Sequence, residues 1–447
     1  MASVKQEEKP RGIELHARLS MKPQDDLNDT ESIKKAAGLT LATCALLWGL
    51  YMYIVGELYM DERYHVPQGL SIHEWIRKGF KGSYEVDPDI TTFPGIYFLA
   101  FLTGGFAVGP EYSLTALGVF RLCNAIFVPA FQFFCVYKMQ RTVSGTLLAV
   151  LFPINFFYNF MFYTDPAATA FVLASLWLLR DRKFFLSGIA AIAAVVIRQT
   201  NIVWIFGLSL DHVFTLWKLR RSVPKFILGV VKDLWLHAAV GVWFAAFLVN
   251  NNFSIVIGHH EHHAMHLHLS QMNYLIFTLV VTLDPRVLFR FTEPRSRREK
   301  LVFASVLLSA VLASEFGYMR HIFLNDTRHL SHAFHRWFAN YRIVRSGLIP
   351  LIVAQGLSKS DLFKGRIEGL RASLFWLCTF MVLIPTPLME FRYFTVPGVL
   401  LLLGVPWTET RKWNMIKLFI YGNAFSFILF LYFPIFGDEG DWRRLMY

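Results

Sequence analysis

The chain has 447 residues, of which 55% are hydrophobic and only 17% charged, and its mean hydropathy is +0.41. Soluble domains carry about 25% charged residues, so this composition excludes a soluble globular protein. The formal net charge of +12 is compatible with nucleic-acid binding, but Lys and Arg fall in short loops between apolar runs, which positive-inside membrane topology explains better. We therefore expect a protein of the lipid bilayer that binds no nucleic acid.

A polar N-terminus precedes a long apolar remainder. Residues 1–36 carry both signs of charge and lack the apolar core of a cleavable signal, which is typical of a disordered cytosolic tail. Over residues 37–447 no period of about 20 to 50 residues repeats, and no Pro/Gly linker separates a soluble domain. The sequence therefore predicts a single polytopic membrane domain over residues 37–447.

Long apolar runs fill this domain. A helix needs about 20 apolar residues to cross the hydrocarbon core, and unpaired backbone groups are too costly in lipid for open structures to persist. The pattern predicts an all-α integral membrane protein, a polytopic helical bundle with about 11 to 14 spans. The runs cover residues 39–59, 93–109, 114–136, 144–160, 166–179, 184–197, 202–216, 226–249, 270–290, 301–318, 343–357, 369–388, 391–407 and 415–434.

The basic loops give the orientation. An excess of Lys and Arg marks the cytosolic side of a membrane protein. We therefore assign to the cytosol the basic loops at residues 180–183, 218–225, 295–300, 359–366 and 411–417. Alternation of the spans then places five segments in the lumen: 60–92, 163–165, 198–201, 250–269 and 319–342. One misfit remains, because two full spans over 93–136 would put the basic segment 137–141 on the luminal side. The sequence leaves open whether 93–109 is re-entrant.

The first luminal loop, about residues 60–92, opens with two carboxylates. Asp61 and Glu62 directly follow the first span, at the water–lipid boundary, where an acid can take a proton from a sugar hydroxyl if one substrate is lipid-linked. The alternative is that both are solvated loop acids. Asp87 and Pro94-Gly95 supply turn chemistry, and a loop of this length with such punctuation is expected to fold onto the membrane as short helices.

Further polar residues interrupt the apolar segments on the luminal side. Arg198 and Gln199 stand in an otherwise apolar stretch, where an unpaired charge costs several kcal/mol. Two interpretations remain open: Arg198 binds a phosphate, or the segment is a plain luminal turn. Two more polar groups are candidates for substrate binding. They are the cluster Asp326, Arg328 and His329, and the pair Glu390 and Arg392.

A histidine-rich segment precedes the run at 270–290. Some of its members have the i,i+4 spacing of a helical metal site, but neutral His beside a span can equally bind sugar hydroxyls or sit at the interface. The segment contains His259, His260, His262, His263, His266 and His268.

Six motifs follow one another from about residue 58 to residue 395: MDERYHVPQ, DPDITTFPGIY, RQTNIVW, GxxxxHxxxLHLxQ, DxRH and EFRYF. In this order they together resemble one enzyme family, the alpha-1,2-glucosyltransferases that add the terminal glucose in the lipid-linked oligosaccharide pathway. One departure is that Gly258 is followed by two His where the family carries Asp-Lys or Asp-Arg, which argues against a role for His259 and His260 and against a metal.

The resemblance implies an inverting glycosyltransferase of GT-C type in the endoplasmic reticulum membrane, with its active site facing the lumen. It would transfer glucose from dolichyl phosphate glucose to a diglucosylated dolichyl-diphosphate-linked oligosaccharide for protein N-glycosylation, without a cofactor or metal. Asp61 is then the candidate base, Glu62 an alternative base or acceptor-orienting group, and Arg198 the partner of the leaving dolichyl phosphate. Further substrate-binding candidates are Gln199, Asp87, His263, His268, Asp326, Arg328, His329, Glu390 and Arg392.

Two other classes remain open. Another polyprenyl-phosphate-sugar transferase, such as a mannosyltransferase, would use the same loop acid and luminal Arg, because the residues alone do not identify the donor sugar. A transporter or channel-modulating membrane protein would also carry intramembrane charge. Transporters often show paired repeats with broken helices in corresponding positions. The chain shows no such duplication, and the long first luminal loop favours an enzyme.

Overall fold

A computed structural model describes residues 27–219, 222–258, 267–316, 341–364, 370–386, 390–432, 435–436 and 442–443. In these residues the regular structure is helical apart from one two-stranded antiparallel ladder, which confirms the predicted all-α class. The α-helices are α2 (Leu27–Ile54), α3 (Glu62–Arg77), α4 (Gly95–Leu102), α5 (Leu114–Leu122), α6 (Val128–Gln140), α7 (Val143–Val150), α8 (Pro153–Tyr158), α9 (Thr164–Arg180), α10 (Phe184–Ile197), α11 (Ile202–Leu219), α12 (Val223–Asn250), α13 (Ser270–Leu283), α14 (Arg297–Phe316), α16 (Ile349–Lys359), α17 (Asp361–Lys364), α18 (Leu370–Leu383), α19 (Thr395–Gly404) and α20 (Glu409–Tyr432). The strands are β1 (Ile435–Phe436) and β2 (Trp442–Arg443).

Short helices of other types link several of these elements. Two π-helical turns lie at Cys123–Phe127 and Val344–Leu348. Three-residue to five-residue 3-10 helices lie at Gly105–Ala107, Gln199–Asn201, Pro285–Phe289 and Phe391–Phe394.

By length and composition, five helical stretches of the described chain can cross a membrane. Four shorter apolar helices accompany them, so the chain is a polytopic helical membrane protein, as predicted. The number of about 11 to 14 crossings stays a prediction, since several helices are shorter than the about 20 residues that a straight span requires. The five stretches are Thr30–Ile54, Leu114–Gln140, Gln199–Leu219, Val223–Asn250 and Glu409–Tyr432.

The first helix begins earlier than the expected tail ends. Helix α2 starts at Leu27, so residues 27–36, which we assigned to a disordered tail, are helical. The segment contains Glu31, Lys34, Lys35 and Ala36, which favour helices, and Glu31 and Lys35 form an i,i+4 ion pair with an N–O distance of 2.6 Å. Local helix propensity thus extends the first span outward from its apolar part.

Helix lengths bear on the misfit in the orientation over residues 93–136. Helix α4 has eight residues, which is about 12 Å and too short to cross the hydrocarbon core. In contrast, α5, the π-helical turn and α6 form one continuous helix of 27 residues, about 40 Å long. By length, only the second of these helices can cross a membrane, which favours a single crossing between residues 93 and 140.

Local sequence signals explain where this long helix and its neighbour begin and end. Ser113 caps α5 by accepting a hydrogen bond from the Ala116 N–H at 3.0 Å. The helix ends at Arg141, whose φ is +56°, and Thr142 then caps α7 through the Gly145 N–H. Pro153 opens α8 after a break, because proline fits the first turn of a helix but not its interior.

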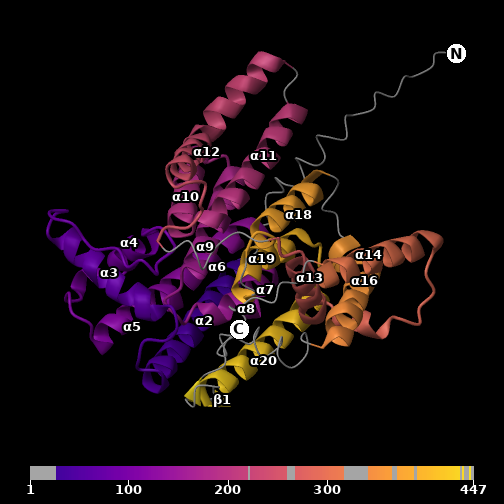
Figure 1. Cartoon of the computed structure of the whole chain (residues 1–447), viewed down its shortest axis with the longest axis horizontal. Helices are drawn as coiled ribbons and strands as arrows, with labels where there is room; N and C mark the ends of the chain where they lie inside the picture. Colours follow the sequence, from indigo (N-terminus) through magenta and orange to yellow (C-terminus); the bar gives the residue numbers. More distant parts are fainter. Residues whose placement is uncertain are drawn as a thin grey trace.

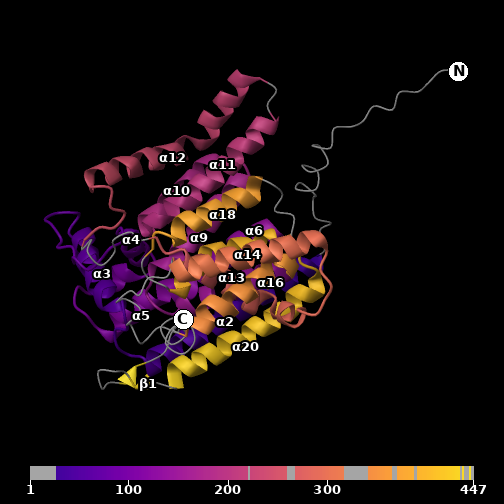
Figure 2. The ribbon, with the colours of Figure 1, turned by 45° about the vertical axis from the view of Figure 1, so that its right-hand side comes forward.

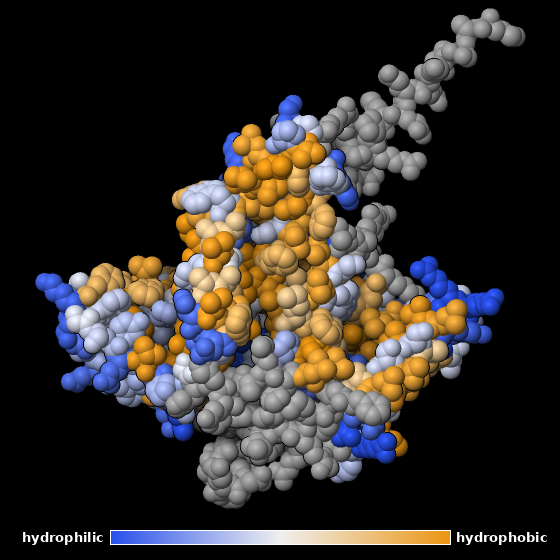
Figure 3. Space-filling view, turned by 45° about the horizontal axis from the view of Figure 1, so that its top comes forward, coloured by the Kyte–Doolittle hydropathy of each residue, from blue (hydrophilic) through white to orange (hydrophobic). Residues whose placement is uncertain are grey.

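The elements form three packed groups around separate apolar cores. Helices α3 to α5 gather at one side, α10, α11, α12 and α18 form a second group, and α7, α8, α13, α16 and α20 contribute to the largest core (Figure 1). Helix α9 lies between them, and α11 and α12 project beyond the rest (Figures 1 and 2). Apolar side chains cover much of the projecting pair, whereas hydrophilic ones gather at the tips of the molecule (Figure 3), as expected of a protein surrounded by lipid.

The bundle has two ends of different character. What we call the basic end carries the loops around residues 141, 181–183, 284–300, 359–361 and 405–411. Side chains join these loops: Arg411 pairs with Asp284 at 3.0 Å, and Ser360 donates to the same carboxylate at 2.6 Å. The opposite end, the cavity end, carries the start of α3, the start of α9 and the turn between α10 and α11.

Candidate active site

A cavity of about 200 Å³ opens at the cavity end of the bundle. Its walls come from the start of α3, the loop before α4, the start of α9, the turn between α10 and α11, the segment after α12 and the two sides of the α18–α19 connection. Seven parts of the chain that are far apart in sequence therefore meet in one place. The polar side chains of the lining are Asp61, His65, Thr91, Thr92, Thr164, Asp165, Thr169, Arg198, Gln199, Thr200, Asn201, Thr386, Arg392 and Tyr393.

Asp61 and Arg392 form an ion pair in this cavity. Arg392 Nη1 donates to Asp61 Oδ2 at 2.8 Å, and its Nε donates to a carboxylate oxygen of Glu390. The Asp61 side chain is 36% exposed, so it is partly accessible beside the guanidinium. The pair places an accessible carboxylate next to a cation, which is suited to hold an anionic substrate and a hydroxyl at once.

A second ion pair lines the same cavity. Arg198 Nη1 donates to Asp165 Oδ2 at 2.9 Å and to the Thr164 hydroxyl at 3.2 Å. Arg198 is also 5.3 Å from the centre of the Tyr393 ring, so an aromatic face holds the guanidinium from another side. Asp165 lies in the first turn of α9, where the helix dipole favours a negative charge.

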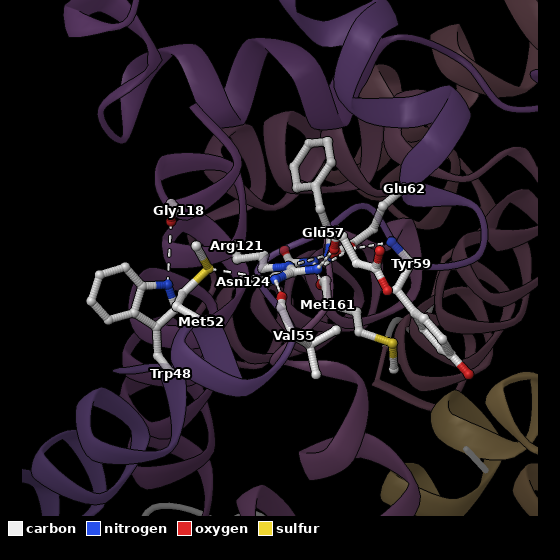
Figure 4. A network of polar contacts seen from close by, with 11 residues as sticks. Trp48, Met52, Val55, Glu57, Tyr59, Glu62, Gly118, Arg121, Asn124 and Met161 are labelled. Carbon is white, nitrogen blue, oxygen red and sulfur yellow. Dashed lines mark hydrogen bonds and ion pairs between the residues drawn. The ribbon is translucent and has the colours of Figure 1, made fainter. Parts of the chain in front are cut away.

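Glu62 faces away from the cavity, although it follows Asp61 directly. Its side chain is 0% exposed and forms a bidentate pair with Arg121, whose Nη2 donates to Oε2 at 2.6 Å and whose Nε donates to Oε1 at 3.0 Å (Figure 4). The backbone N–H groups of Tyr59 and Phe162 donate to the same carboxylate. With four donors and no accessible surface, Glu62 has no free position from which to reach a substrate.

Exposure separates the three carboxylates near the start of α3 and α9. The exposed fractions of the side chains are 36% for Asp61, 5% for Asp165 and 0% for Glu62. A base must touch the proton that it removes. Asp61 meets this requirement best, whereas Asp165 holds Arg198.

His65 lines the cavity one helical turn after Asp61. Its Nδ1 lies 2.7 Å from the Tyr97 hydroxyl. Burial, together with the charges of Arg392 and Arg198, lowers the pKa of His65 from 6.5 to about 4 despite the opposing effect of Asp61. The ring is therefore neutral at neutral pH and serves as a hydrogen-bonding group rather than as a cation.

Gln199 ties three segments of the cavity wall together. Its amide nitrogen donates to the carbonyl oxygen of Thr91 and, at 3.1 Å, to that of Ile255. The first luminal loop is held in the same way by Gln68, which accepts a hydrogen bond from the Asp87 N–H at 2.7 Å. These amides act on backbone groups, so they shape the cavity instead of presenting charge to it.

The structure brings together some of the predicted site residues and separates others. Asp61, Arg198, Gln199 and Arg392 line the cavity, and Glu390 lies behind Arg392. Four predicted residues that the structure describes are not part of the lining: Glu62, Asp87, His268 and Glu390. The remaining candidates lie outside the described residues, and these are His259, His260, His262, His263, His266, Asp326, Arg328 and His329.

In the part of the chain that the structure describes, no group of three or more His, Cys, Asp or Glu side chains lies close enough to hold a metal ion. The four cysteines, Cys44, Cys123, Cys135 and Cys378, are buried and free. Most of the histidine-rich segment lies outside the described residues, so its role as a metal ligand stays a hypothesis.

Sequence reasoning missed three residues of this region. Asp165 was read only as part of a luminal turn, although an acid at the start of an apolar helix is a functional signal. The same signal marks Arg121 within the apolar run 114–136. Tyr393 gave no signal, since an aromatic residue at the end of a span is ordinary.

The comparisons with known proteins agree in one activity. A human protein named Dol-P-Glc:Glc(2)Man(9)GlcNAc(2)-PP-Dol alpha-1,2-glucosyltransferase is 28% identical over 459 residues, covering 89% of this chain and 94% of the human one. Proteins of the same name from Drosophila melanogaster and Arabidopsis thaliana are 27% and 26% identical; they cover 84% and 90% of this chain and 90% and 98% of their own lengths. No solved structure matches the chain.

The family comparison covers the cavity as well as most of the bundle. The model of the DIE2/ALG10 family matches residues 55–218 and 209–403. The matched ranges include Asp61, Asp165, Arg198 and Arg392, and they extend over more than half of the sequence. This chain belongs to the DIE2/ALG10 family.

Proposed function

We propose that this chain transfers glucose in alpha-1,2 linkage from dolichyl phosphate glucose to a diglucosylated dolichyl-diphosphate-linked oligosaccharide, adding the third and terminal glucose. The printed activity of its relatives and the membership in the family support the substrates. The single observation that carries the mechanism is the cavity in which the accessible carboxylate of Asp61 lies beside Arg392 and in one lining with Arg198.

Asp61 is the proposed general base. Its carboxylate takes the proton of the acceptor 2-hydroxyl, and the freed oxygen forms a bond to C1 of the glucose. The bond from C1 to the phosphate oxygen breaks at the opposite face, so the configuration at C1 inverts. Glu62 then has no part in proton transfer; it holds the backbone around Asp61 through its contacts with Tyr59 and Phe162.

The two arginines are the proposed phosphate ligands. The electron pair of the broken bond stays on the dolichyl phosphate, whose charge rises as it leaves, and a planar guanidinium can stabilise that charge with two parallel hydrogen bonds. Arg198 is held by Asp165 and Arg392 by Glu390, so each keeps its orientation before the phosphate binds. The proposed chemistry needs protein side chains alone.

The proposed orientation puts the cavity in the lumen of the endoplasmic reticulum. The loops of the basic end carry the excess of Lys and Arg that marks a cytosolic side, and the cavity lies at the other end. The single crossing by α5 and α6 supports this parity, because it returns the chain from the loop 60–92 to the basic segment 137–141. The donor and acceptor would then reach Asp61 from the luminal leaflet.

The test is a lipid-linked oligosaccharide profile. The chain is expressed in cells that lack their own terminal glucosyltransferase, and the glucose number of the dolichol-linked species is measured. We expect the wild type and the control variant Asp89→Asn to convert the diglucosylated species to the triglucosylated one. We expect no conversion with an equally well-expressed Asp61→Asn.

Other outcomes discriminate the two rival classes. A well-expressed wild type that leaves the diglucosylated species unchanged contradicts the proposed donor or acceptor. Release of another sugar from its polyprenyl phosphate by purified protein would then identify a different transferase. Movement of a lipid-linked or free solute across proteoliposomes, with no transfer, would identify a transporter.

A further inference from the structure

We propose that Arg121 is a positioning residue for this reaction, a buried clamp that fixes the turns carrying Asp61 and Asp165 in their working arrangement. The inference rests on the proposed function, because it assigns Asp61 to the chemistry. Arg121 lies in α5, is not part of the cavity lining and is 0% exposed, so its effect on the reaction must pass through the groups that it holds.

Arg121 holds the turn that ends in Asp61 at three points. Its Nη1 donates to the Val55 carbonyl oxygen at 2.5 Å, its Nη2 donates to that of Glu57 at 2.7 Å, and its Nε and Nη2 form the bidentate pair with Glu62 (Figure 4). The ring of Tyr51 packs 4.3 Å from the guanidinium carbon. A single side chain therefore fixes the chain from the end of α2 to the start of α3.

The same clamp reaches the segment before Asp165. Glu62 accepts a hydrogen bond from the Phe162 N–H at 2.8 Å. One turn after Arg121, the Asn124 amide donates to the carbonyl oxygens of Met161 at 2.8 Å and Tyr163 at 2.6 Å. Residues 161–163 lead directly into α9 and Asp165, so both carboxylates of the cavity depend on one turn of the helix that carries Arg121 and Asn124.

The backbone at this place carries features that need such a clamp. Met60, the residue before Asp61, has a φ of +56°, a left-handed conformation that a residue with a side chain adopts only when its surroundings impose it. The helix that carries Asn124 changes to π-helical hydrogen bonding at Cys123–Phe127, and such turns are frequent at functional sites. An apolar residue would fill the volume of Arg121, but it would bind neither the two carbonyl groups nor Glu62.

Two variants test the inference in purified, detergent-solubilised enzyme. Arg121→Lys keeps the charge opposite Glu62 but cannot bind the carboxylate and two carbonyl groups with a planar fork. The double variant Arg121→Gln/Glu62→Gln removes both charges together, so that no buried charge is left unpaired. The matched control is His212→Gln/Asp233→Asn, which removes a buried pair with an N–O distance of 3.0 Å between α11 and α12, away from the cavity lining.

The readouts are the amount of folded monomer, kcat per folded enzyme and KM for dolichyl phosphate glucose. We expect kcat of the Arg121→Lys enzyme to fall about 10-fold and that of the double variant about 100-fold, because small displacements of a base cost that much, while KM changes less than about 3-fold. A positioning role requires that the conservative variant Arg121→Lys keep part of the activity that the double variant loses. The control variant should keep the wild-type kcat.

Two results would overturn the proposal. If folded Arg121→Lys and the folded double variant both keep the wild-type kcat, Arg121 serves stability alone. If the double variant fails to fold, Arg121→Lys decides by the same criterion. A wild type that is folded but inactive with dolichyl phosphate glucose is a different result, since it removes the proposed function itself and with it the role of Asp61.

Discussion

Arg392 Nη1 lies 2.8 Å from Asp61 Oδ2, although 331 positions of the sequence separate the two residues. The pair joins the start of α3 to the 3-10 helix before α19. Because Arg392 also binds Glu390, a phosphate that approaches the guanidinium competes with two carboxylates. Arg392 thus positions Asp61, the proposed base, and is also suited to bind the leaving phosphate.

Replacing Asp61 by Asn tests its role as the base. The amide keeps the shape of the side chain but cannot take the proton of the acceptor hydroxyl, so kcat is expected to fall about 100- to 10,000-fold with little change in KM. The measurement is glucose transfer by purified enzyme. Asp89→Asn is the matched control, because Asp89 is an exposed acid of the same loop and is not part of the cavity lining. Equal activity of Asp61→Asn and the wild type would contradict the assignment.

Replacing Arg198 by Gln tests the phosphate site. A charge-assisted hydrogen bond to the leaving phosphate would be lost, and kcat/KM for dolichyl phosphate glucose is expected to fall about 10- to 100-fold while KM for the acceptor stays unchanged. Lys78→Gln removes an exposed cation from the end of α3 and serves as control. A larger effect on the acceptor KM than on the donor would place Arg198 at the acceptor instead.

Much of the fold could be predicted from the sequence, because lipid imposes helices on apolar runs. The apolar runs at 114–136, 226–249 and 415–434 correspond to long helices. The run at 93–109 shows the limit of that reasoning. Its composition is that of a span, but Pro94 precedes α4 and two consecutive Gly residues, Gly104 and Gly105, follow it, so the helix has only eight residues. Hydropathy alone does not measure helix length.

The site was predictable in part. Asp61 and Arg198 stand out because charged residues beside apolar runs are costly without a role. The sequence could not separate Asp61 from Glu62, since the two are adjacent and only their partners distinguish them. Those partners, Arg392 and Arg121, come from distant helices, and the direction in which each carboxylate points is set by tertiary packing.

Gly258 is expected to be essential for the wall of the cavity. Its φ is +80°, and a Cβ atom there would lie 2.8 Å from the Ile90 carbonyl oxygen and closer still to that of Pro88. Gly258→Ala should therefore cost about 2 kcal/mol or more and lower the melting temperature by several degrees. The check is thermal unfolding in detergent.

Gly241→Ala is the control for that experiment. Gly241 lies inside α12, and a Cβ atom there meets nothing within 4 Å, so the change should leave stability unchanged or raise it slightly. If Gly258→Ala melts at the temperature of the wild type, the close packing of its segment against the first luminal loop carries no stability.

Acid should destabilise the first luminal loop through His73. The ring is fully buried, stacks on Phe120 with centres 4.9 Å apart, and has Nε2 2.8 Å from the Tyr97 carbonyl oxygen. Burial lowers the pKa of His73 from 6.5 to about 4, and the charge of Arg77 acts in the same direction. Between pH 6.5 and 4 the unfolded chain therefore binds a proton that the folded chain does not.

The free energy of unfolding therefore has its full value above pH 6.5 and falls as the pH drops toward 4. The decrease is up to about 1.4 kcal/mol per pH unit for this one proton. His73→Gln can keep a donor for the Tyr97 carbonyl group and removes the titration. Thermal unfolding in detergent between pH 7 and pH 4.5 should then show a flatter pH dependence for the variant than for the wild type, by about one proton in slope. Parallel curves for the two proteins would mean that His73 titrates alike in the folded and unfolded chains, and that its burial imposes no cost on its charged form.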